Sequence, residues 1–446
     1  MIKGLRHTLF CYLLGISSNW ALTQDGLYGA IDTSGQTVIP FVYNSLSTPT
    51  HGVLVARQDN RFGLLDTEGE EVAPFIYSSI GSFENGMAVY SVAPQTCGYI
   101  DTLGQAVTRS VYDRCEPFHD SLAWVGKMQG GELRYGTINR RGEQVIPFQY
   151  EAPGKHTAMD GLYKIKQGGL YGLIDRKGQV LAAPQYDRMS VFSEGRLQVM
   201  KGLFFGFLDH TGQEVIPCQY HWARDFLDGQ SYTGIGNVIF LIDLQGDTIY
   251  DARGLHLQSV FAEDGLARIK TNGKEGFINR ERELVVPPHY QLIEQVRYGL
   301  RRVRLDRKEG MLDENWEVVI PLEYDVLRAD TGGSIIAWKN GRCGVIDYSN
   351  NIVIPFEYDN IEGFREGRDF TVVTKGYRNA VADRSGNILV PFDYAPATYL
   401  RFPFGLDPFR KDGKIGYLNL RGETKIPFIY KTASPFTKYG IAVCSK

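Results

Sequence analysis

The chain has 446 residues, of which 43% are hydrophobic and 22% are charged. This composition is typical of a globular protein and excludes an intrinsically disordered chain. The formal net charge of −3 at pH 7 argues against a general nucleic-acid-binding protein, which would carry a strongly basic surface. We therefore expect no nucleic-acid partner.

Residues 1–23 have the pattern of a secretory signal peptide. Lys3 and Arg6 precede a short apolar stretch at 9–16, and small and polar residues follow it. Such a segment directs export and is then removed, so we expect a secreted, periplasmic or cell-envelope protein. The alternative interpretation is an N-terminal capping strand. The rest of the chain has no apolar run of the required length, about 18 residues, so no transmembrane segment is expected in the mature chain.

The remaining residues, 24–446, repeat one short pattern about twelve times at intervals of 34–38 residues. Each unit has aspartate or asparagine, usually with glycine three residues before and three residues after it, and then proline and tyrosine. The residues of these turns include Asp32, Gly35, Asp66, Gly69, Asp175, Gly178, Asp209, Gly212, Asp383 and Gly386. The seventh unit, near 237–260, is degenerate and lacks both the proline and the tyrosine. This periodicity predicts an array of one small structural unit.

Each Asp-x-x-Gly is expected to form the tip of a β-hairpin. The aspartate accepts a backbone N–H two residues on, and the glycine supplies a positive φ. Apolar and β-branched residues flank the turn, as in 135–147, which is typical of strands. A third strand follows in many units, with alternating apolar and polar residues as in 86–92. We therefore predict an all-β fold of three-stranded antiparallel meanders.

The repeat pattern also predicts which residues form the core and which lie at sheet edges. Proline cannot donate to a sheet ladder, so it should end the second strand or lie on a sheet edge. Six units carry a phenylalanine six residues beyond the tyrosine, and we assign these side chains to the core. They are Phe83, Phe118, Phe192, Phe226, Phe364 and Phe436.

Twelve such units can build an open superhelix or a closed ring. The first unit lacks a leading strand, and the chain ends with a spare strand at 440–444. In a ring, this strand would complete the first sheet and leave no free edge. Propellers, however, typically have four to eight four-stranded blades, and these units are shorter. We therefore favour an open superhelix, or β-solenoid, over a closed propeller-like ring.

The repeated motifs Gly-x-Ile-Asp-x-x-Gly, Val-Ile-Pro-x-x-Tyr and Phe-x-x-Gly-x-Ala-x-Val resemble the WG-repeat family, also called KWG repeats, of mainly bacterial proteins. The tryptophan that names the family is replaced here by residues such as Tyr28, Phe62 and Cys97. The resemblance implies a β-rich scaffold or interaction module without a shared catalytic site. It therefore supplies no catalytic residue to carry over to this chain.

No motif of the sequence predicts catalysis, a metal or a cofactor. The histidines are scattered through different units, and HExxH, GxSxG and phosphate-binding glycine loops are missing from the sequence. Each repeat turn offers about one carboxylate, whereas a calcium site needs six or more oxygens. Cys97 and Cys115 fall within one unit and either form a bridge, in an oxidising compartment, or remain separate thiols. We expect a protein that is not an enzyme.

Three features are candidate ligand contacts. Trp316 replaces the turn glycine of a hairpin tip, where a side chain normally points outward, so we expect it to be exposed. Arg302 and Arg304 share one face of a predicted strand, which is either a solvated outer face or an anion-binding patch. Phe402 and Phe404 lie in a segment rich in phenylalanine and proline, which is either a binding loop or a wide elbow.

These features together predict a non-catalytic binding or scaffold protein that presents an extended surface to a protein partner. The alternative is a cell-envelope protein that binds carbohydrate or peptidoglycan. A hydrolase with an unrecognised site comes third. The sequence does not predict the oligomeric state or which face of the array binds.

Overall fold

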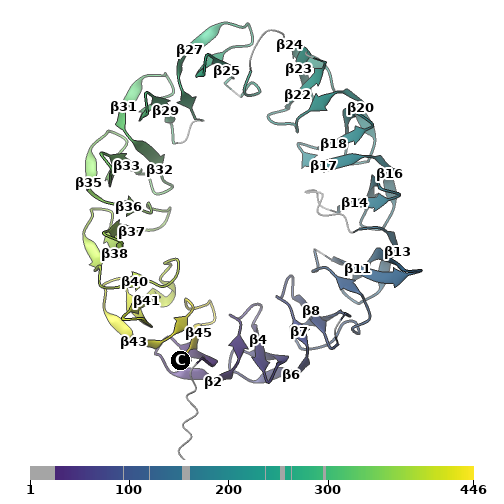
Figure 1. The fold of residues 1–446 in the computed structure, drawn as a ribbon, viewed down its shortest axis with the longest axis vertical. Helices are drawn as coiled ribbons and strands as arrows, with labels where there is room; N and C mark the ends of the chain where they lie inside the picture. The colour runs from purple at the N-terminus through teal and green to yellow at the C-terminus, as the bar shows by residue number, and fades with distance from the viewer. Residues whose placement is uncertain are drawn as a thin grey trace, which may run out of the picture.

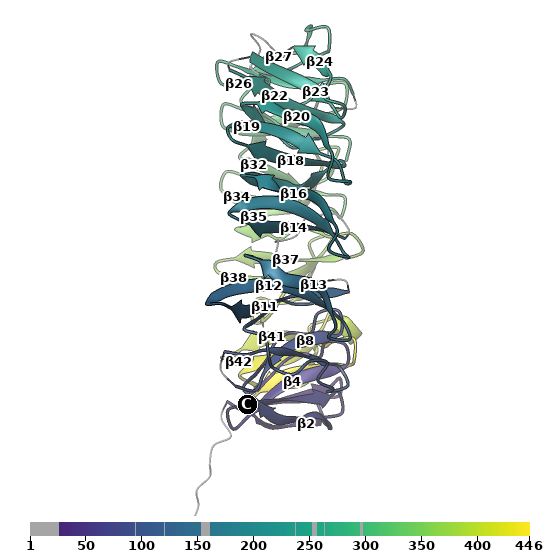
Figure 2. The same cartoon turned by 90° about the vertical axis from the view of Figure 1, so that its right-hand side faces the viewer.

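The protein closes into a ring of small β-sheets. The computed structural model describes residues 26–93, 95–119, 121–152, 161–236, 238–251, 257–262, 264–294 and 298–446. These residues form twelve antiparallel sheets, which stand side by side around the ring in Figure 1 and are seen edge-on in Figure 2. The arrangement is that of a twelve-bladed β-propeller. The expected signal peptide, residues 1–23, lies outside the described residues.

The ring closes because the two ends of the described chain share the first blade. This sheet has the order β2-β1-β45-β44. Tyr28 lies opposite Ser445, and Asp32 lies opposite Ile441. The strands are β1 (Tyr28–Asp32), β2 (Thr37–Tyr43), β44 (Thr432–Ala433) and β45 (Ile441–Ser445). The expectation of an open superhelix or solenoid is therefore wrong, because the spare last strand covers the edge of the first unit.

Most blades have four strands and not the expected three. Among the described residues, nine sheets have four strands and three sheets have three. The second blade contains β3 (Ser45–Leu46), β4 (Val53–Gln58), β5 (Arg61–Asp66) and β6 (Glu71–Tyr77) in spatial order. Tyr43 pairs within the first blade, whereas the N–H of Asn44 already donates to Arg57 of the second blade. The additional strand is too short to show an alternating pattern in the sequence.

The same order continues around most of the ring, with the short strands toward the centre and the last strand of the blade outside (Figure 1). Blades three to seven contain β7 (Ser79–Ile80), β8 (Met87–Ser91), β9 (Gly98–Asp101); β10 (Arg114–Cys115), β11 (Leu122–Gln129), β12 (Glu132–Asn139), β13 (Gln144–Tyr150); β14 (Leu162–Gln167), β15 (Leu170–Asp175), β16 (Val180–Tyr186); β17 (Arg188–Ser193), β18 (Arg196–Lys201), β19 (Phe204–Leu208), β20 (Glu214–Tyr220); and β21 (Trp222–Ala223), β22 (Gln230–Ile235), β23 (Val238–Asp243), β24 (Thr248–Asp251).

Blades eight to twelve contain β25 (Ala267–Thr271), β26 (Lys274–Ile278), β27 (Leu284–Tyr290); β28 (Leu292–Ile293), β29 (Arg301–Leu305), β30 (Lys308–Leu312), β31 (Val318–Tyr324); β32 (Val326–Ala329), β33 (Ile335–Lys339), β34 (Arg342–Ile346), β35 (Ile352–Tyr358); β36 (Asn360–Ile361), β37 (Phe370–Lys375), β38 (Arg378–Asp383), β39 (Ile388–Val390); and β40 (Ala395–Pro396), β41 (Leu406–Lys411), β42 (Lys414–Asn419), β43 (Thr424–Tyr430). A single 3-10 turn among the described residues, η1 (Pro403–Gly405), precedes β41.

The outer strand of a typical blade bulges around its proline. In the second blade, Phe62 lies opposite Tyr77 and Leu64 lies opposite Ala73. Between these two pairs β6 therefore contains more residues than β5, which is a β-bulge. Pro74 lies within this bulge and is exposed, at a sheet edge where no N–H is required. Tyr77 then returns to the sheet and is buried.

The core lies between neighbouring sheets. One cluster joins Leu64 and Tyr77 of the second blade to Ile100 of the third. The phenylalanines assigned to the core are all buried: Phe83, Phe118, Phe192, Phe226, Phe364 and Phe436. Burial of large apolar side chains at each junction stabilises the contact between blades.

The Asp-x-x-Gly turn of a blade packs against the preceding blade. Asp32 Oδ1 accepts the N–H groups of Ser34 and Gln36, each at 2.9 Å. In the next blade a Cβ added to Gly69, whose φ is +90°, would lie 3.3 Å from Ile39 of the first blade. The turn glycine is therefore an interface position as well as a turn former.

Candidate functional site

Trp316 is packed between two blades. It is half-buried, and its ring centroid lies 5.0 Å from that of Phe277 in the preceding blade. The Arg301 guanidinium lies 4.3 Å from the Trp316 ring centroid. The expectation of an exposed tryptophan at a free tip is therefore wrong, because the turn-glycine position faces the neighbouring blade.

A second contact between blades recurs with a fixed spacing of 18 residues. It starts at the residue before the first glycine of a unit, where the family has tryptophan. Glu309 Oε2 accepts the N–H of Leu327 at 2.8 Å, and Glu275 makes the same contact with Ile293 at 2.9 Å. The partner is always in the short strand of the next blade. We call this contact the 18-residue latch.

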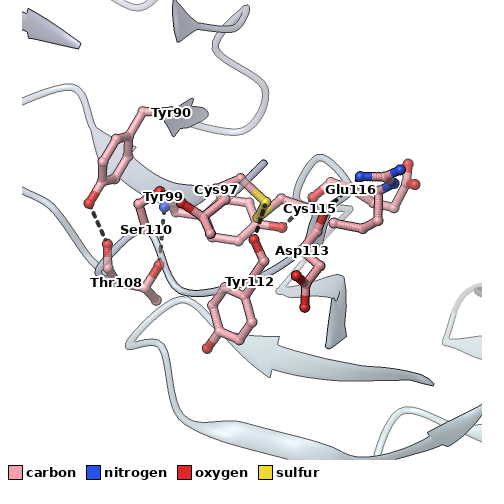
Figure 3. The surroundings of a disulfide bond; sticks show 11 residues. Tyr90, Cys97, Tyr99, Thr108, Ser110, Tyr112, Asp113, Cys115 and Glu116 are labelled. Carbon is pink, nitrogen blue, oxygen red and sulfur yellow. Dashed lines mark hydrogen bonds between the residues drawn. A yellow bond between two sulfur atoms is a disulfide. The ribbon is translucent and has the colours of Figure 1, made fainter. Parts of the chain in front are cut away.

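The latch is covalent between the third and fourth blades. Cys97 and Cys115 form a disulfide (Figure 3), which answers the question that the sequence left open. Beside it, the Tyr99 hydroxyl donates to the backbone carbonyl of Glu116 at 2.6 Å. The third sheet, β7-β8-β9, has only three described strands, so the bridge joins the fourth blade to a sheet that is smaller than most.

The latch glutamate of the ninth blade is neutralised by the two candidate arginines. Glu309 is fully buried and accepts hydrogen bonds from Arg302 Nη1 at 3.1 Å and Arg304 Nε at 2.9 Å. Burial opposes the charge of Arg302, but its hydrogen bonds and charge interactions with Glu294 and Glu309 outweigh burial and raise its pKa. These arginines therefore form a structural ion network with Glu309, and Arg302 also reaches a pocket.

We call this cavity the arginine pocket. It has a volume of about 730 Å³ and extends over blades eight to ten. Its polar and aromatic lining includes Arg268, Arg302, Arg328, Glu294, Ser259 and Trp338. Among the described lining residues Glu294 is the one carboxylate, against three guanidinium groups, while Glu275 and Glu309 pair with Arg268 and Arg302 from behind the lining.

The guanidinium groups of the pocket keep hydrogen-bonding capacity. The Nε atoms of Arg268 and Arg302 are buried and have no partner within the described part of the chain. Arg328 Nη2 donates to the carbonyls of Ile361 and Glu362 in the next blade, at 2.8 and 2.9 Å. These Nε atoms are closed to solvent, so a ligand would meet the partly exposed remainder of the Arg268 and Arg302 side chains.

Exposed aliphatic side chains lie on the same arc of the ring. They occupy the first position of four successive outer strands, and we call them the aliphatic row: Leu284 (57% exposed), Val318 (54%), Ile352 (62%) and Ile388 (40%). In most other blades this position is polar, as in Thr37, Glu71, Gln144, Glu214, Thr248 and Thr424. The four side chains stand one per blade on separate outer strands, and exposed apolar groups of this kind favour contact surfaces.

The candidate phenylalanines belong to an elbow before β41. Phe404 is 60% exposed, whereas Phe402 is half-buried and lies 5.3 Å from the ring of Phe370. Both have positive φ, 51° and 54°. Asp407 is fully buried and accepts the N–H of Phe402 at 2.6 Å, and burial raises its pKa. The carboxylate therefore fixes a strained turn that presents Phe404.

The structure brings the sequence-predicted candidates to three places. Trp316 lies in the junction of blades eight and nine, Arg302 and Arg304 lie at Glu309, and Phe402 and Phe404 lie in the elbow. In the ranges listed above no group of three or more His, Cys, Asp or Glu side chains could hold a metal. No helix in this part of the chain has the length and apolarity to cross a membrane.

Sequence reasoning missed Arg268 and Arg328 of the pocket. A usable signal was present, because Glu275 and Glu309 stand where the family has an aromatic residue, and a buried glutamate requires basic partners. It also missed the residue after the repeat tyrosine, which caps the turn between two strands. Asp187 Oδ2, for example, accepts the N–H of Gly202 at 2.7 Å.

The sequence profile of a family described as "WG containing repeat" matches nine segments of the chain. They are residues 28–62, 62–92, 98–127, 135–171, 171–202, 205–232, 276–308, 344–377 and 415–444. The longest unmatched stretches are 233–275, 309–343 and 378–414. Much of the arginine pocket and the elbow lie in these stretches, so both sites are found where the chain departs from the repeat. No protein of curated function matches the sequence.

Solved structures give only weak likenesses. A eukaryotic initiation factor is 12% identical, covers 76% of this chain and 95% of its own, and has a TM-score of 0.27. The extracellular domain of a one-component system from B. thetaiotaomicron is 9% identical, with coverages of 95% and 81% and a TM-score of 0.21. Dihydro-heme d1 dehydrogenase NirN is 15% identical, with coverages of 69% and 76% and a TM-score of 0.26. Likenesses of this size carry no argument about function.

Proposed function

Because the chain belongs to the WG-containing repeat family, we propose that it is a non-catalytic ring that holds a partner protein on the arc of blades eight to eleven. The observation that carries this proposal is the arginine pocket, in which three successive blades each contribute a guanidinium group. The partner contributes an acidic segment, whose carboxylates accept hydrogen bonds from these groups.

Electrostatics favour an acidic segment over a neutral one. The pocket and its ion pairs hold five cations, Arg268, Lys270, Arg302, Arg304 and Arg328, against three carboxylates, Glu275, Glu294 and Glu309, which leaves an excess of two positive charges among the described residues. A flat carboxylate matches the planar donor geometry of arginine. Complementary charge then fixes the register of the partner and accelerates its association.

The aliphatic row favours a protein over a carbohydrate as the partner. Leu284, Val318 and Ile352 are more than half exposed and belong to the blades that form the pocket. A protein can bury these side chains in an interface, which contributes about 25 cal/mol per Å² of apolar area. A carbohydrate, the alternative ligand, gains less from an aliphatic surface and is favoured here only by Trp338 in the pocket lining.

We place this function outside the cytoplasm. The Cys97–Cys115 disulfide supports export, because such bonds persist mainly in oxidising compartments. The signal-peptide pattern of residues 1–23 points to the same location.

The test is quantitative affinity purification from an envelope extract with four baits: the wild type, Arg268→Ala/Arg328→Ala, Leu284→Ser/Val318→Ser/Ile352→Ser, and the control Val180→Ser. Val180 is exposed at the same strand position in the fifth blade. Its substitution therefore replaces an exposed aliphatic side chain by serine outside the proposed binding arc. The proposal predicts one defined acidic protein that both arc variants lose and the control retains. Equal retention by all baits, or retention of a glycan alone, would contradict it.

A further inference from the structure

The junction of blades five and six contains a smaller cavity, which we call the lysine pocket. Its volume is about 290 Å³, the lower end of the range for small-molecule sites. The residues that matter for its chemistry are Lys164, Arg188, Tyr171, Met200 and Phe205. It shares no lining residue with the arginine pocket, and its strands β14, β17 and β18 lie across the ring from β29, β32 and β33 (Figure 1).

Lys164 stands in the fifth blade where Arg302 stands in the ninth. Each residue directly precedes the strand residue that lies opposite the first glycine of its unit. Lys164 Nζ donates to the carbonyl of Met189 at 2.9 Å, as Arg302 Nη1 donates to the carbonyl of Leu327 at 2.9 Å. Both carbonyls belong to the first strand of the next blade, so the two basic side chains make the same contact between blades.

The fifth blade lacks the carboxylate that completes this network in the ninth. Tyr171 takes the place of Glu309 directly before the first glycine. Its ring centroid lies 5.1 Å from Lys164 Nζ and 5.6 Å from Lys166 Nζ. Among the described residues Lys164 has no carboxylate partner. An uncharged ring thus faces two ammonium groups at a position where the ninth blade holds a buried carboxylate.

The ammonium group of Lys164 therefore remains available to an anion. Lys164 is half-buried, and of its three N–H donors the carbonyl of Met189 takes one. Burial lowers the pKa of Lys164, whereas the glutamates around Arg302 raise the pKa of that residue. An anion in the pocket would offset the cost of burying the Lys164 charge.

A second cation stands beside Lys164 in the lysine pocket. Arg188 is exposed and lines the cavity, and the described lining contains these two cations and no carboxylate. The acidic residues that adjoin these strands are engaged at hairpin tips. Asp187 Oδ2 accepts the N–H of Gly202 and Glu151 Oε1 accepts that of Gly168, both at 2.7 Å.

The remaining wall of the lysine pocket is apolar. Tyr171, Met200 and Phe205 line it and are half-buried, so part of each side chain is open to a ligand. Burial of an apolar ligand body against this wall adds to the affinity. A fully hydrated anion such as inorganic phosphate gains nothing from these side chains.

We propose that the lysine pocket binds a small organic carboxylate with an apolar body. The ligand carboxylate accepts hydrogen bonds from Lys164 and Arg188 and supplies the partner that Glu309 supplies within the ninth blade. This site goes beyond the proposed protein-binding function, because it lies across the ring from the arc of blades eight to eleven and takes a different ligand.

The test is a ligand-detected NMR titration of the full chain with benzoate and hexanoate, with the neutral amides benzamide and hexanamide, and with inorganic phosphate. We expect saturable binding of at least one of the two carboxylates. Its amide should bind at least tenfold more weakly, because it carries no charge. Lys164→Met removes the ammonium group with little change of length and should weaken carboxylate binding about tenfold, as expected for one lost charge-assisted hydrogen bond.

Tyr171 provides a matched pair of variants. Tyr171→Glu places within the chain the carboxylate that the fifth blade lacks, so a ligand must compete with it for Lys164. Tyr171→Gln has the same size and also lacks the ring, but it carries no charge. The glutamate variant should therefore bind the carboxylate at least tenfold more weakly than the glutamine variant.

Two controls separate this site from a general charge effect and from the protein-binding arc. Lys177→Met removes a lysine from the exposed turn of the same blade and should bind like the wild type, as should Arg268→Ala/Arg328→Ala. Thermal midpoints establish that all variants are folded. The proposal is overturned if neither carboxylate binds, if the amides bind equally well, if phosphate binds best, or if folded Lys164→Met binds like the wild type and Tyr171→Glu like Tyr171→Gln.

Discussion

The Cys97–Cys115 disulfide stands in the same position between two blades as Cys343 and the backbone of Ile361. In each pair the first residue precedes the first glycine position of its unit, and the second lies 18 residues later in the short strand of the next blade. The Cys343 thiol is buried against the backbone of Ile361, and burial raises its pKa to about 11. The latch position therefore holds a disulfide, a glutamate or a thiol at the same 18-residue spacing.

This equivalence predicts that Ile361→Cys forms a disulfide with Cys343. The substitution places a second sulfur where Cys115 stands in the fourth blade. Mass spectrometry after alkylation under oxidising conditions should show the new bridge beside Cys97–Cys115. Leu327→Cys is the matched control, because its latch partner is Glu309 and its thiol should remain free. A free thiol at 361 in the folded variant would show that the two junctions differ in geometry.

The turn glycines provide a matched pair for the interface. Gly35 and Gly212 both have positive φ, +87° and +81°, but an added Cβ meets its nearest neighbour at 3.5 Å at Gly35 and at 2.6 Å at Gly212, where the neighbour is backbone of Leu181. Alanine at either position costs about 1 kcal/mol of backbone strain. Gly212→Ala should cost about 2 kcal/mol more through overpacking. Urea denaturation measures both, and equal losses would contradict the placement of this turn against the fifth blade.

Removal of Glu309 should destabilise the ninth and tenth blades. Glu309→Ala leaves Arg302 and Arg304 without their buried partner and frees the N–H of Leu327. We expect a loss of about 3 kcal/mol, near the low end for breaking a buried ion pair, because Arg304 is partly exposed. The exposed Glu314→Ala is the control for removing one acidic charge. If the two variants unfold at the same denaturant midpoint, the ion network around Glu309 does not stabilise these blades and the prediction is wrong.

Asp407 should make the stability depend on pH. Burial raises its pKa above the ordinary 3.8, so the folded state favours the protonated carboxyl. Its stabilising effect is fully present below about pH 3.8 and is lost as the pH rises through the folded-state pKa. The unfolding free energy of the wild type minus that of Asp407→Asn should therefore decrease between pH 3 and pH 7. A difference that rises or stays constant would contradict the burial of a charged Asp407.

The repeat residues predicted the local structure well. Asp32 and Gly35 identify a hairpin tip because both form hydrogen bonds with residues that are close to them in the sequence. The closure of the ring could not be predicted in this way, because it depends on β45 meeting β1 across almost the whole chain. The short strands escaped recognition because a strand such as Ser45–Leu46 contains no alternation.

The sequence singled out candidate residues where they departed from the repeat. Phe404 is exposed, in a segment that the sequence left open as a binding loop or a wide elbow. Trp316 was misplaced because the turn position faces the preceding blade, a relationship between units that no single unit contains. Arg268 and Arg328 went unnoticed because the pocket forms from three blades, and each arginine alone resembles an ordinary surface residue.

Ring closure is the central claim, and one distance tests it most directly. Spin labels are placed at Val42→Cys in β2 and Thr432→Cys in β44, with Cys11, Cys218, Cys343 and Cys444 replaced by alanine and the Cys97–Cys115 bridge kept oxidised. Both label sites belong to the first blade, at the two edges of the order β2-β1-β45-β44. Three interstrand spacings of about 4.8 Å separate them, so pulsed electron paramagnetic resonance should give a single short distance, about 15–20 Å with the label arms. A distance well beyond this range would show that the array is open and would contradict the propeller.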